Sequence, residues 1–384
     1  MLIGIDASRA NEEQKTGVGW YAFFLIQEIK KIERLKDCKI DDAVKFVLYV
    51  REPLKGELAE LPKNWTQKVL KWPPQRFWTQ IRLSWEMLIN PPDVLFIPAH
   101  VFPIIHPKKT IMTVHDTAAL HFPESYNWFE KWYTVWSARY AVRRLWRVIV
   151  PSEFIKEELL GDIGDKRCEI RDREKIFVIP HGYDKRYRRY EMGDKYFENI
   201  NKILKKYNIE RPFVLSVGRL EEKKNTARII EAFDAVRQSS LITYHLSLIL
   251  IGPPGHGYKK VENAINSSSF KQDIKTLGYV GAEDLQYIMN AAEVFVYPSL
   301  YEGFGLPILE ALACGVPVVA GKGSCLEEVG DNACIYVDPT NVDEIARAIN
   351  SVRQNHNPDT GFKQVEKFSW EKSAKQVANL LELA

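Results

Sequence analysis

The chain has 384 residues, 46% hydrophobic and 27% charged, a balance typical of a globular protein with a large core. Its 53 basic and 50 acidic side chains leave a net charge of +3, which excludes the strongly basic composition of many nucleic-acid-binding proteins. The five cysteines form no C-x-x-C pair and favour reduced thiols over disulfides or a zinc site. The N-terminus does not resemble a signal peptide, and no apolar run reaches about eighteen residues. We therefore expect a cytoplasmic location.

Short apolar runs alternate with helical patterns along the whole chain. In the first half they lie at 2–8, 44–50, 94–100, 110–116, 147–152 and 175–182. In the second half they lie at 212–219, 246–254, 276–281, 294–299, 317–323 and 334–339. Most are continuous rather than alternating, as is typical of parallel strands buried on both faces. The pattern predicts an α/β protein with two Rossmann-like, doubly wound parallel sheets in series, joined within the polar stretch 181–212.

Two cations follow one predicted strand of the second half. The motif SVGRLEEKKN places Arg219 and Lys224 after a strand that ends at Gly218. Ligands of open α/β sheets bind at the carboxyl ends of strands, and two cations at this spacing can converge there on a polyanion. A solvated turn before a charged helix start is the alternative.

A second anion site is predicted in the motif EGFGLPILE. Gly303 and Gly305 allow the backbone to approach a ligand closely, and Pro307 suits the start of a helix. The backbone N–H groups of Phe304, Gly305 and Leu306 would then face a phosphate.

Two glutamates flank this second site. Glu302 precedes the helix, and Glu310 falls in its first turn, where a carboxylate also simply favours the helix dipole. A carboxylate is in addition a strong acceptor for a pair of sugar hydroxyls. A nucleoside diphosphate sugar accounts for both features, because its diphosphate suits the cations and the helix N-terminus while its two sugars suit the acids.

The first half carries weaker signals. Gly17 and Gly19 precede a helix and, with Ala22, fit a dinucleotide fingerprint, although they lie about ten residues beyond the strand. A plain helix start is the alternative, and a nicotinamide dehydrogenase would rest on this match alone. His115 ends a predicted strand, where a lone histidine is usually a satisfied core or turn residue. Asp116 would orient His115 or cap the next segment.

Two segments combine aromatic and basic side chains. In PPQRFWTQIRLSWE, Arg76 and Gln80 would share a helical face and grip hydroxyls or a lipid phosphate, although packing or plain surface exposure is more common. Between 128 and 147, an aromatic stripe runs beside an arginine row, as in helices that rest on anionic membranes. We favour packing of this stripe on the sheet, because the helix lies between two predicted buried strands. The stripe is Trp128, Trp132, Trp136 and Tyr140, and the row is Arg139, Arg143 and Arg147.

Together these motifs resemble the retaining glycosyltransferases of family 4, which have the GT-B fold. The resembling segments are, in order, TVHDTAALHFPE, VIVPSEF, VIPHGYD, VGRLEEKKN, VFVYPSLYEGFGLPILEALACGVPVVA, SCLEEVGDNACIYVDP and FSWEKSA. The resemblance covers nearly the whole chain. It implies an acceptor-side domain at 1–185 and a donor-binding domain at 186–367 that face each other across a cleft. A C-terminal helix at about 368–384 would pack back on the first domain.

The resemblance also implies roles for individual residues. Arg219 and Lys224 would neutralise the donor diphosphate as it leaves. Glu302 would bind hydroxyls of the transferred sugar, and Glu310, at the far end of the Glu-x7-Glu arrangement, would bind the nucleotide ribose. His115 would contact the transferred sugar. The remaining donor contacts would come from Gly17, Gly19, Gly218, Tyr279, Val280, Gly303, Phe304, Gly305 and Leu306.

The implied reaction moves a hexose, with GDP-mannose as the favoured donor, to a hydroxyl of a glycan or lipid-linked glycan of surface polysaccharides. The resemblance implies that the anomeric configuration is retained. Because no carboxylate is evidently placed to attack the anomeric carbon, a same-face displacement is the working hypothesis. The sequence contains no Asp-x-Asp, so neither a metal clamp nor a cofactor is expected, and peripheral contact with the inner face of the membrane is left open. A nucleotide-sugar epimerase, a sugar phosphorylase and a non-catalytic sugar-nucleotide-binding subunit are the alternatives.

Overall fold

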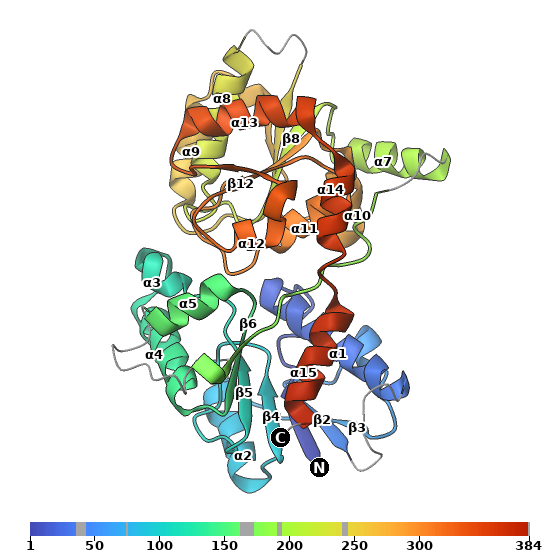
Figure 1. The fold of residues 1–384 in the computed structure, drawn as a ribbon, viewed down its shortest axis with the longest axis vertical. Helices are drawn as coiled ribbons and strands as arrows, with labels where there is room; N and C mark the ends of the chain where they lie inside the picture. Colours follow the sequence, from blue (N-terminus) through green and yellow to red (C-terminus); the bar gives the residue numbers. More distant parts are fainter. Residues whose placement is uncertain (36–43, 74–75, 162–172, 190–193, 240–244, 383–384) are drawn as a thin grey trace. The chain divides into compact units, whose positions relative to one another are not determined.

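The computed structural model describes residues 1–35, 44–73, 76–161, 173–189, 194–239 and 245–382 (Figure 1). It divides into two compact units, which are considered separately. Unit 1 comprises Met1–Gly182 and Ser369–Ala384, and unit 2 comprises Tyr183–Phe368. The sequence places these boundaries after residues 185 and 367. Residues 190–193 of the predicted join lie outside the described residues.

Unit 1 contains, among its described residues, a parallel seven-stranded sheet in the order β3-β2-β1-β4-β5-β6-β7. Its strands are β1 (Leu2–Asp6), β2 (Lys45–Val50), β3 (Trp65–Val69), β4 (Val94–Ile97), β5 (Thr110–Thr113), β6 (Arg147–Val150) and β7 (Ile176–Val178). Its α-helices are α1 (Gly17–Leu35), α2 (Ser84–Ile89), α3 (Ala118–His121), α4 (Trp128–Arg144), α5 (Glu153–Gly161) and α15 (Trp370–Glu382). Shorter turns of helix are η1 (Gly56–Ala59), the π-helical η2 (Trp78–Leu83) and η3 (Pro123–Ser125).

The C-terminal helix α15 belongs to unit 1 and packs against α1. Trp370 stacks on Phe24 of α1, with the ring centroids 5.5 Å apart. Ser373 Oγ donates a hydrogen bond of 2.5 Å to the carbonyl oxygen of Pro180. The end of the chain therefore covers α1 and contacts the segment that follows β7.

Unit 2 contains a second parallel sheet, whose described strands lie in the order β10-β9-β8-β11-β12-β13. The strands are β8 (Phe213–Val217), β9 (Ser247–Ile251), β10 (Ile274–Thr276), β11 (Val294–Tyr297), β12 (Val318–Gly321) and β13 (Ile335–Val337). The α-helices are α7 (Asp194–Lys206), α8 (Thr226–Gln238), α9 (Tyr258–Ser267), α10 (Ala282–Ala291), α11 (Leu306–Ala313), α12 (Leu326–Gly330), α13 (Val342–Asn355) and α14 (Pro358–Val365). Two 3₁₀ turns are η4 (Lys271–Asp273) and η5 (Asp331–Ala333).

Two details of the strand prediction are wrong. Strand β3 was not predicted, because Trp65 and Val69 are its only apolar residues and it lies at the edge of the sheet. The predicted strand 276–281 instead begins at Ile274 and ends at Thr276, since Gly278 takes a positive φ of 65° that turns the chain.

Both sheets confirm the predicted fold class of two doubly wound parallel sheets. In each, the strand order reverses beside the first strand, between β1 and β4 in unit 1 and between β8 and β11 in unit 2. Ligands of open α/β sheets bind at the carboxyl ends of the strands beside such a switch point. The loops that follow β8 and β11 are therefore the first place to look for a site in unit 2.

Candidate active site

An ion pair joins the loops after β8 and β11. Lys224 Nζ lies 2.5 Å from Glu302 Oε1 and donates a second hydrogen bond, of 3.0 Å, to the hydroxyl of Tyr297. The side chains of Lys224 and Glu302 are only 19% and 9% exposed. One of the two predicted cations thus neutralises one of the two predicted acids. Glu302 therefore does not oppose the binding of an anion nearby as an unpaired carboxylate would.

The same contacts fix the protonation of the site. Burial alone would raise the pKa of Glu302, but the charges of Lys224 and Lys223 and its hydrogen bonds outweigh burial and lower this pKa below its ordinary value. Burial raises the pKa of Tyr297 well above its ordinary value, and the charge of Glu302 adds to that rise. At neutral pH, Glu302 is a carboxylate and Tyr297 a neutral phenol.

Helix α11 begins four residues after Glu302. Gly305 caps it with a φ of 101°, and Pro307 occupies its first turn. A Cβ on Gly305 would lie 2.5 Å from the end of the Leu326 side chain, at Cδ2, but the positive φ is what requires glycine here. The N-terminus of the helix, with its partial positive charge, thus immediately follows the loop that carries the ion pair.

The second acid, Glu310, is not in the first turn of α11. The helix begins at Leu306 rather than at Pro307, so Glu310 is its fifth residue and the predicted first-turn position is wrong. Burial and the charge of Asp184 raise the pKa of Glu310 to about 8, while Arg186 opposes the rise. Glu310 is therefore largely protonated at neutral pH, and its carboxyl group can both donate and accept hydrogen bonds.

Asp184 and Arg186 form the charged surroundings of Glu310, although the sequence alone suggested no role for them. Arg186 Nη2 lies 2.5 Å from Asp184 Oδ2, and Arg186 Nη1 lies 3.2 Å from Glu283 Oε1. Asp184 ends the motif VIPHGYD, one of the segments that resemble the family, and this position was the feature of the sequence that could have suggested a role.

Two glycines bring the carboxyl ends of β8 and β9 together. Gly218 and Gly252 have φ values of 150° and 143°, and a Cβ on Gly252 would lie 2.0 Å from the carbonyl oxygen of Gly218. Arg219, which follows, is exposed and has no ion pair with any residue that the structure describes. The predicted pair of cations is thus unequal, since Lys224 is committed to a carboxylate and Arg219 reaches solvent.

The predicted base contact lies at the same edge of this sheet. Gly252 forms an isolated bridge to Gly278, just beyond the end of β10. Tyr279 is 58% exposed, whereas Val280 is buried. The bridge therefore places Tyr279 and Val280 at the carboxyl edge that also carries Gly218.

Asn225 ties together three loops of this edge and was missed in the sequence. Its Nδ2 donates hydrogen bonds to the carbonyl oxygens of Pro298, at 3.0 Å, and Pro339, at 2.5 Å. These two prolines follow β11 and β13, while Asn225 itself follows β8 and takes a left-handed φ of 61°. Asparagine tolerates this conformation better than most residues, and this preference was the feature of the sequence that could have drawn attention to Asn225.

In unit 1, His115 lies two residues after β5 and is buried. Its Nε2 is 3.0 Å from the carbonyl oxygen of Pro98, and its ring meets Tyr21 edge-on at 4.6 Å. Burial, with the proximity of His100, lowers the pKa of His115 to about 4, so the ring is neutral and Nε2–H donates to Pro98. Asp116 accepts a hydrogen bond from the backbone N–H of Ala118, in keeping with the capping alternative.

The two predicted loop glycines lie inside helix α1 rather than before it. Gly17 is the first residue of α1, and a Cβ there would meet nothing within 4 Å. A Cβ on Gly19 would lie 3.0 Å from the carbonyl oxygen of Arg9, in the loop after β1. Only Gly19 is thus required for close approach, and its partner is the protein backbone.

The aromatic stripe of 128–147 divides into two parts. Trp136 and Tyr140 stack on Phe102, with centroids 5.6 and 5.0 Å apart, as the packing interpretation expects. Trp128 and Trp132, however, are 80% and 51% exposed, so that interpretation is wrong for the N-terminal half of α4.

The basic residues of the two mixed segments also differ from prediction. Arg147 belongs to strand β6 rather than to the helix, because α4 ends at Arg144. Arg76 lies before the π-helical η2, so it does not share a helical face with Gln80.

Two family models match the chain. The model "Glycosyl transferases group 1" matches residues 199–381, and the model "Glycosyltransferase Family 4" matches residues 47–187. The two matches do not overlap and together cover most of the sequence.

Among curated relatives, the chain is 36% identical over 187 residues to O-antigen chain mannosyltransferase B of Escherichia coli, a match that covers 47% of this chain and 49% of that protein. It is 22% identical over 376 residues, 96% of each chain, to O-antigen chain mannosyltransferase RfbU of Salmonella typhimurium. The chain therefore spans about half the length of the first of these relatives and nearly all of the second.

Solved structures share the fold at lower identity. A sucrose-phosphate synthase from Thermosynechococcus elongatus matches with a TM-score of 0.72 and 17% identity, over 100% of this chain and 98% of that one. Anabaena HepE, solved in complex with UDP and glucose, matches with a TM-score of 0.68 and 17% identity, over 100% and 99%. At this identity the likeness establishes the fold alone.

Proposed function

We propose that this chain, which belongs to the glycosyltransferases that combine a family 4 domain and a group 1 domain in a GT-B fold, transfers a hexose from a nucleoside diphosphate sugar to an acceptor hydroxyl. The observation that carries the proposal is the grouping of Lys224, Glu302 and the N-terminus of α11 at the switch point of unit 2.

The diphosphate would bind to Arg219, Lys224 and the N-terminus of α11. An ammonium group has three N–H donors, and Glu302 and Tyr297 accept from Lys224. At least one donor of Lys224 thus remains for a phosphate oxygen without loss of the ion pair. Arg219 supplies a positive charge that forms no ion pair with any residue in the described ranges. Backbone donors of the segment from Gly303 to Leu306 would complete this subsite.

The two acids would bind the two sugars of the donor. The carboxylate of Glu302 would accept hydrogen bonds from hydroxyls of the transferred hexose. The protonated carboxyl group of Glu310 would exchange hydrogen bonds with the ribose. Tyr279 and Val280 are proposed to meet the base through their backbone.

Retention of the anomeric configuration is proposed from the resemblance to family 4, with a non-nucleophilic role for Glu302. Its carboxylate is fixed by Lys224, so it is proposed to orient hydroxyls rather than to attack the anomeric carbon. The acceptor would then enter on the face from which the diphosphate leaves, and the leaving diphosphate would take up the acceptor proton. Preorganised positive charge from Arg219, Lys224 and α11 would stabilise the leaving group, so the transfer is proposed to need no metal ion.

Mannose is the proposed sugar, because two of the curated relatives are named O-antigen chain mannosyltransferases. The acceptor would be a hydroxyl of a glycan or lipid-linked glycan in the synthesis of a surface polysaccharide.

The test is incubation of the chain with GDP-α-mannose, with and without mannose-terminated oligosaccharides, in the presence of EDTA. The proposal predicts acceptor-dependent release of GDP and, by proton NMR, an α-linked product. Isomerisation of the donor without release of GDP would instead identify an epimerase. Tight binding of the donor without turnover with any acceptor would identify a non-catalytic subunit.

A further inference from the structure

A band of exposed apolar side chains lies on unit 1, outside the residues proposed to bind the donor. One part of it comes from the segment of η2 and α2. Its members are between 46% and 58% exposed, although most side chains of this size are buried elsewhere in the chain. They are Phe77, Ile81, Trp85, Leu88 and Ile89.

The other part of the band comes from the loop after β4 and from the start of α4. Its members are Ile104, Ile105, Trp128, Phe129 and Trp132, and the most exposed of them is Trp128, at 80%. These ten side chains are called the apolar surface below. Outside it, the described residues include only three other exposed large hydrophobic side chains, and these lie far from it in the sequence.

Direct contacts join the segments of the apolar surface. The rings of Phe77 and Phe129 meet edge-to-face with centroids 5.7 Å apart, which links the start of η2 to α4. The backbone N–H of Ile105 donates to Ser84 Oγ at 3.4 Å, which links the loop after β4 to α2. The ring centroids of Phe129 and Trp132 lie 6.3 Å apart. The ten side chains therefore belong to one region of unit 1.

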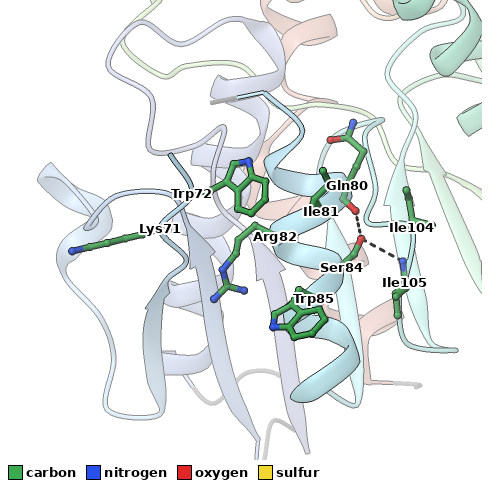
Figure 2. A pocket seen from close by; sticks show the side chains of 9 residues that line it. All are labelled: Lys71, Trp72, Gln80, Ile81, Arg82, Ser84, Trp85, Ile104 and Ile105. Atoms are coloured by element: carbon green, nitrogen blue, oxygen red, sulfur yellow. Dashed lines mark hydrogen bonds between the residues drawn. The ribbon is translucent and has the colours of Figure 1, made fainter. Parts of the chain in front are cut away.

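A groove of about 710 Å³ lies within this region (Figure 2). Trp72, Ile81 and Trp85 line it from one segment, and Ile104 and Ile105 line it from the loop after β4. Lys71, Gln80, Arg82 and Ser84 complete its lining. The groove is thus mostly apolar and carries cationic side chains.

The η2–α2 part of the apolar surface has a positive border, whereas on α4 an acid and a base, Glu130 and Lys131, are both exposed between Phe129 and Trp132. Between residues 70 and 92 the only acidic residue is Glu86, which is 4% exposed and forms ion pairs with Lys68 and with Arg82. Four cations nearby in the sequence are exposed, namely Lys71, Arg76, Lys108 and Lys109. The only carboxylate of the η2–α2 segment is therefore turned inward and neutralised, while the cations face solvent.

We propose that the apolar surface docks unit 1 onto the surface of a lipid bilayer that contains anionic lipids. Tryptophan, isoleucine and leucine side chains would enter the region between head groups and acyl chains, and the surrounding lysines and arginines would pair with lipid phosphates. The contact is peripheral, since no helix among the described residues is long and apolar enough to cross a membrane. The inference concerns the place where the chain acts and does not depend on the proposed donor.

The charge distribution favours a bilayer over a second copy of the chain. In a two-fold symmetric dimer formed through the η2–α2 segment, the segment would meet itself, and its exposed cations would face cations of equal charge. A bilayer with phosphatidylglycerol offers both an apolar interior for the tryptophans and phosphates for the lysines. The apolar surface and its basic border thus match one partner together.

The test is sedimentation of the full chain with vesicles of phosphatidylethanolamine and phosphatidylglycerol, compared with vesicles of pure phosphatidylcholine. The Trp85→Ser/Leu88→Ser double variant removes two exposed side chains, so its folding should be little affected. Phe197→Ser is the matched control, because Phe197 of α7 is 46% exposed, equal to Phe77, but belongs to unit 2. Lys71→Glu and Lys259→Glu, both at exposed positions, form a second pair inside and outside the region.

The proposal predicts that the wild type and Phe197→Ser bind anionic vesicles equally and bind neutral vesicles weakly. The double variant should lose at least about tenfold in affinity, since each side chain contributes apolar area. Lys71→Glu should lose about fivefold or more, whereas Lys259→Glu should not. Equal binding by the double variant, or no binding by the wild type, would overturn the proposal. So would a lipid-independent dimer that the double variant abolishes.

Release of GDP from GDP-mannose in vesicle-free solution separates this proposal from the proposed function. The double variant should release GDP as fast as the wild type with a soluble acceptor. Vesicle binding without any turnover would contradict the transfer reaction and leave the docking surface standing.

Discussion

Replacement of Lys224 by methionine tests the ion pair at the switch point. Methionine keeps most of the length of the side chain but removes its charge and its hydrogen bonds to Glu302 and Tyr297. Glu302, whose side chain is 9% exposed, would then be a buried carboxylate without its cation. Removal of one partner from a buried pair costs about 3–5 kcal/mol. Because the side chain of Lys224 is 19% exposed, we expect a loss near 3 kcal/mol at pH 7.5.

The loss should depend on pH with a definite sign. In the wild type the pKa of Glu302 is lowered, so its stabilising contribution is present above its ordinary value of 4.5 and disappears as the pH falls through the folded-state pKa. In Lys224→Met, burial dominates and raises the pKa of Glu302, so the carboxylate destabilises the fold increasingly as the pH rises above 4.5. The difference between the two proteins is therefore largest at neutral pH and shrinks toward pH 4.

The measurement is thermal and urea unfolding at pH 7.5 and pH 4. The proteins compared are the wild type, Lys224→Met, Glu302→Gln and the variant that combines these two substitutions. A loss of about 3 kcal/mol lowers the melting temperature of a unit of this size by about 6–12 °C. Lys224→Met/Glu302→Gln should lose less free energy of unfolding than the sum of the losses of the two single variants, because it leaves no buried charge. A loss under about 1 kcal/mol at pH 7.5, or an equal loss at both pH values, would refute the reasoning.

Two further predictions concern Glu310 and Gly252. Because the pKa of Glu310 is raised to about 8, ionisation of this group lowers stability between pH 4.5 and pH 8, so Glu310→Gln should gain up to about 3 kcal/mol at pH 7 and little at pH 4.5. Urea unfolding at the two pH values measures this, and an equal gain at both would contradict the raised pKa. Gly252→Ala should cost at least about 2 kcal/mol, because its Cβ would overlap the carbonyl oxygen of Gly218. Gly323→Ala, also at positive φ but with open space around its Cβ, should cost about 1 kcal/mol, and a thermal melt in which both cost the same would count against close approach at Gly252.

The fold was predictable because most strands are continuous apolar runs, which identify buried parallel strands whatever their neighbours are. Strand β3 escaped because it is an edge strand, where Thr66 and Gln67 are exposed and the apolar run breaks down. The closeness of the loops after β8 and β11 was predictable because adjacent strands of a doubly wound sheet end at one edge. Lys224 follows β8 and Glu302 follows β11, so this arrangement of strand ends places the two residues near each other.

The charge states of the site were not predictable. The pairing of Lys224 with Glu302 joins residues 78 positions apart and depends on side-chain packing at the sheet edge. The raised pKa of Glu310 depends on Asp184, in a segment that precedes β8. Patterns among neighbouring residues do not reveal contacts between residues so far apart in the sequence.

Helix α4 shows a similar limit. The four-residue spacing of its aromatic residues predicts a stripe but not how far along the helix a partner covers it. Phe102 stacks on Trp136 and Tyr140, whereas Trp128 and Trp132 remain exposed. Half of the stripe is therefore packing and half is surface.

The most direct test of a sugar-nucleotide site in unit 2 is a thermal-shift comparison of the wild type and Arg219→Ala with GDP-, UDP- and ADP-sugars. Arg219 is exposed, so its removal should leave the ligand-free melting temperature nearly unchanged. A donor at about one hundred times its dissociation constant adds about 2.7 kcal/mol, a rise of about 5–10 °C. We predict this rise with GDP-mannose in the wild type and a much smaller rise in Arg219→Ala. No rise with any of the three nucleotide classes, or an equal rise in both proteins, would contradict the proposed diphosphate site.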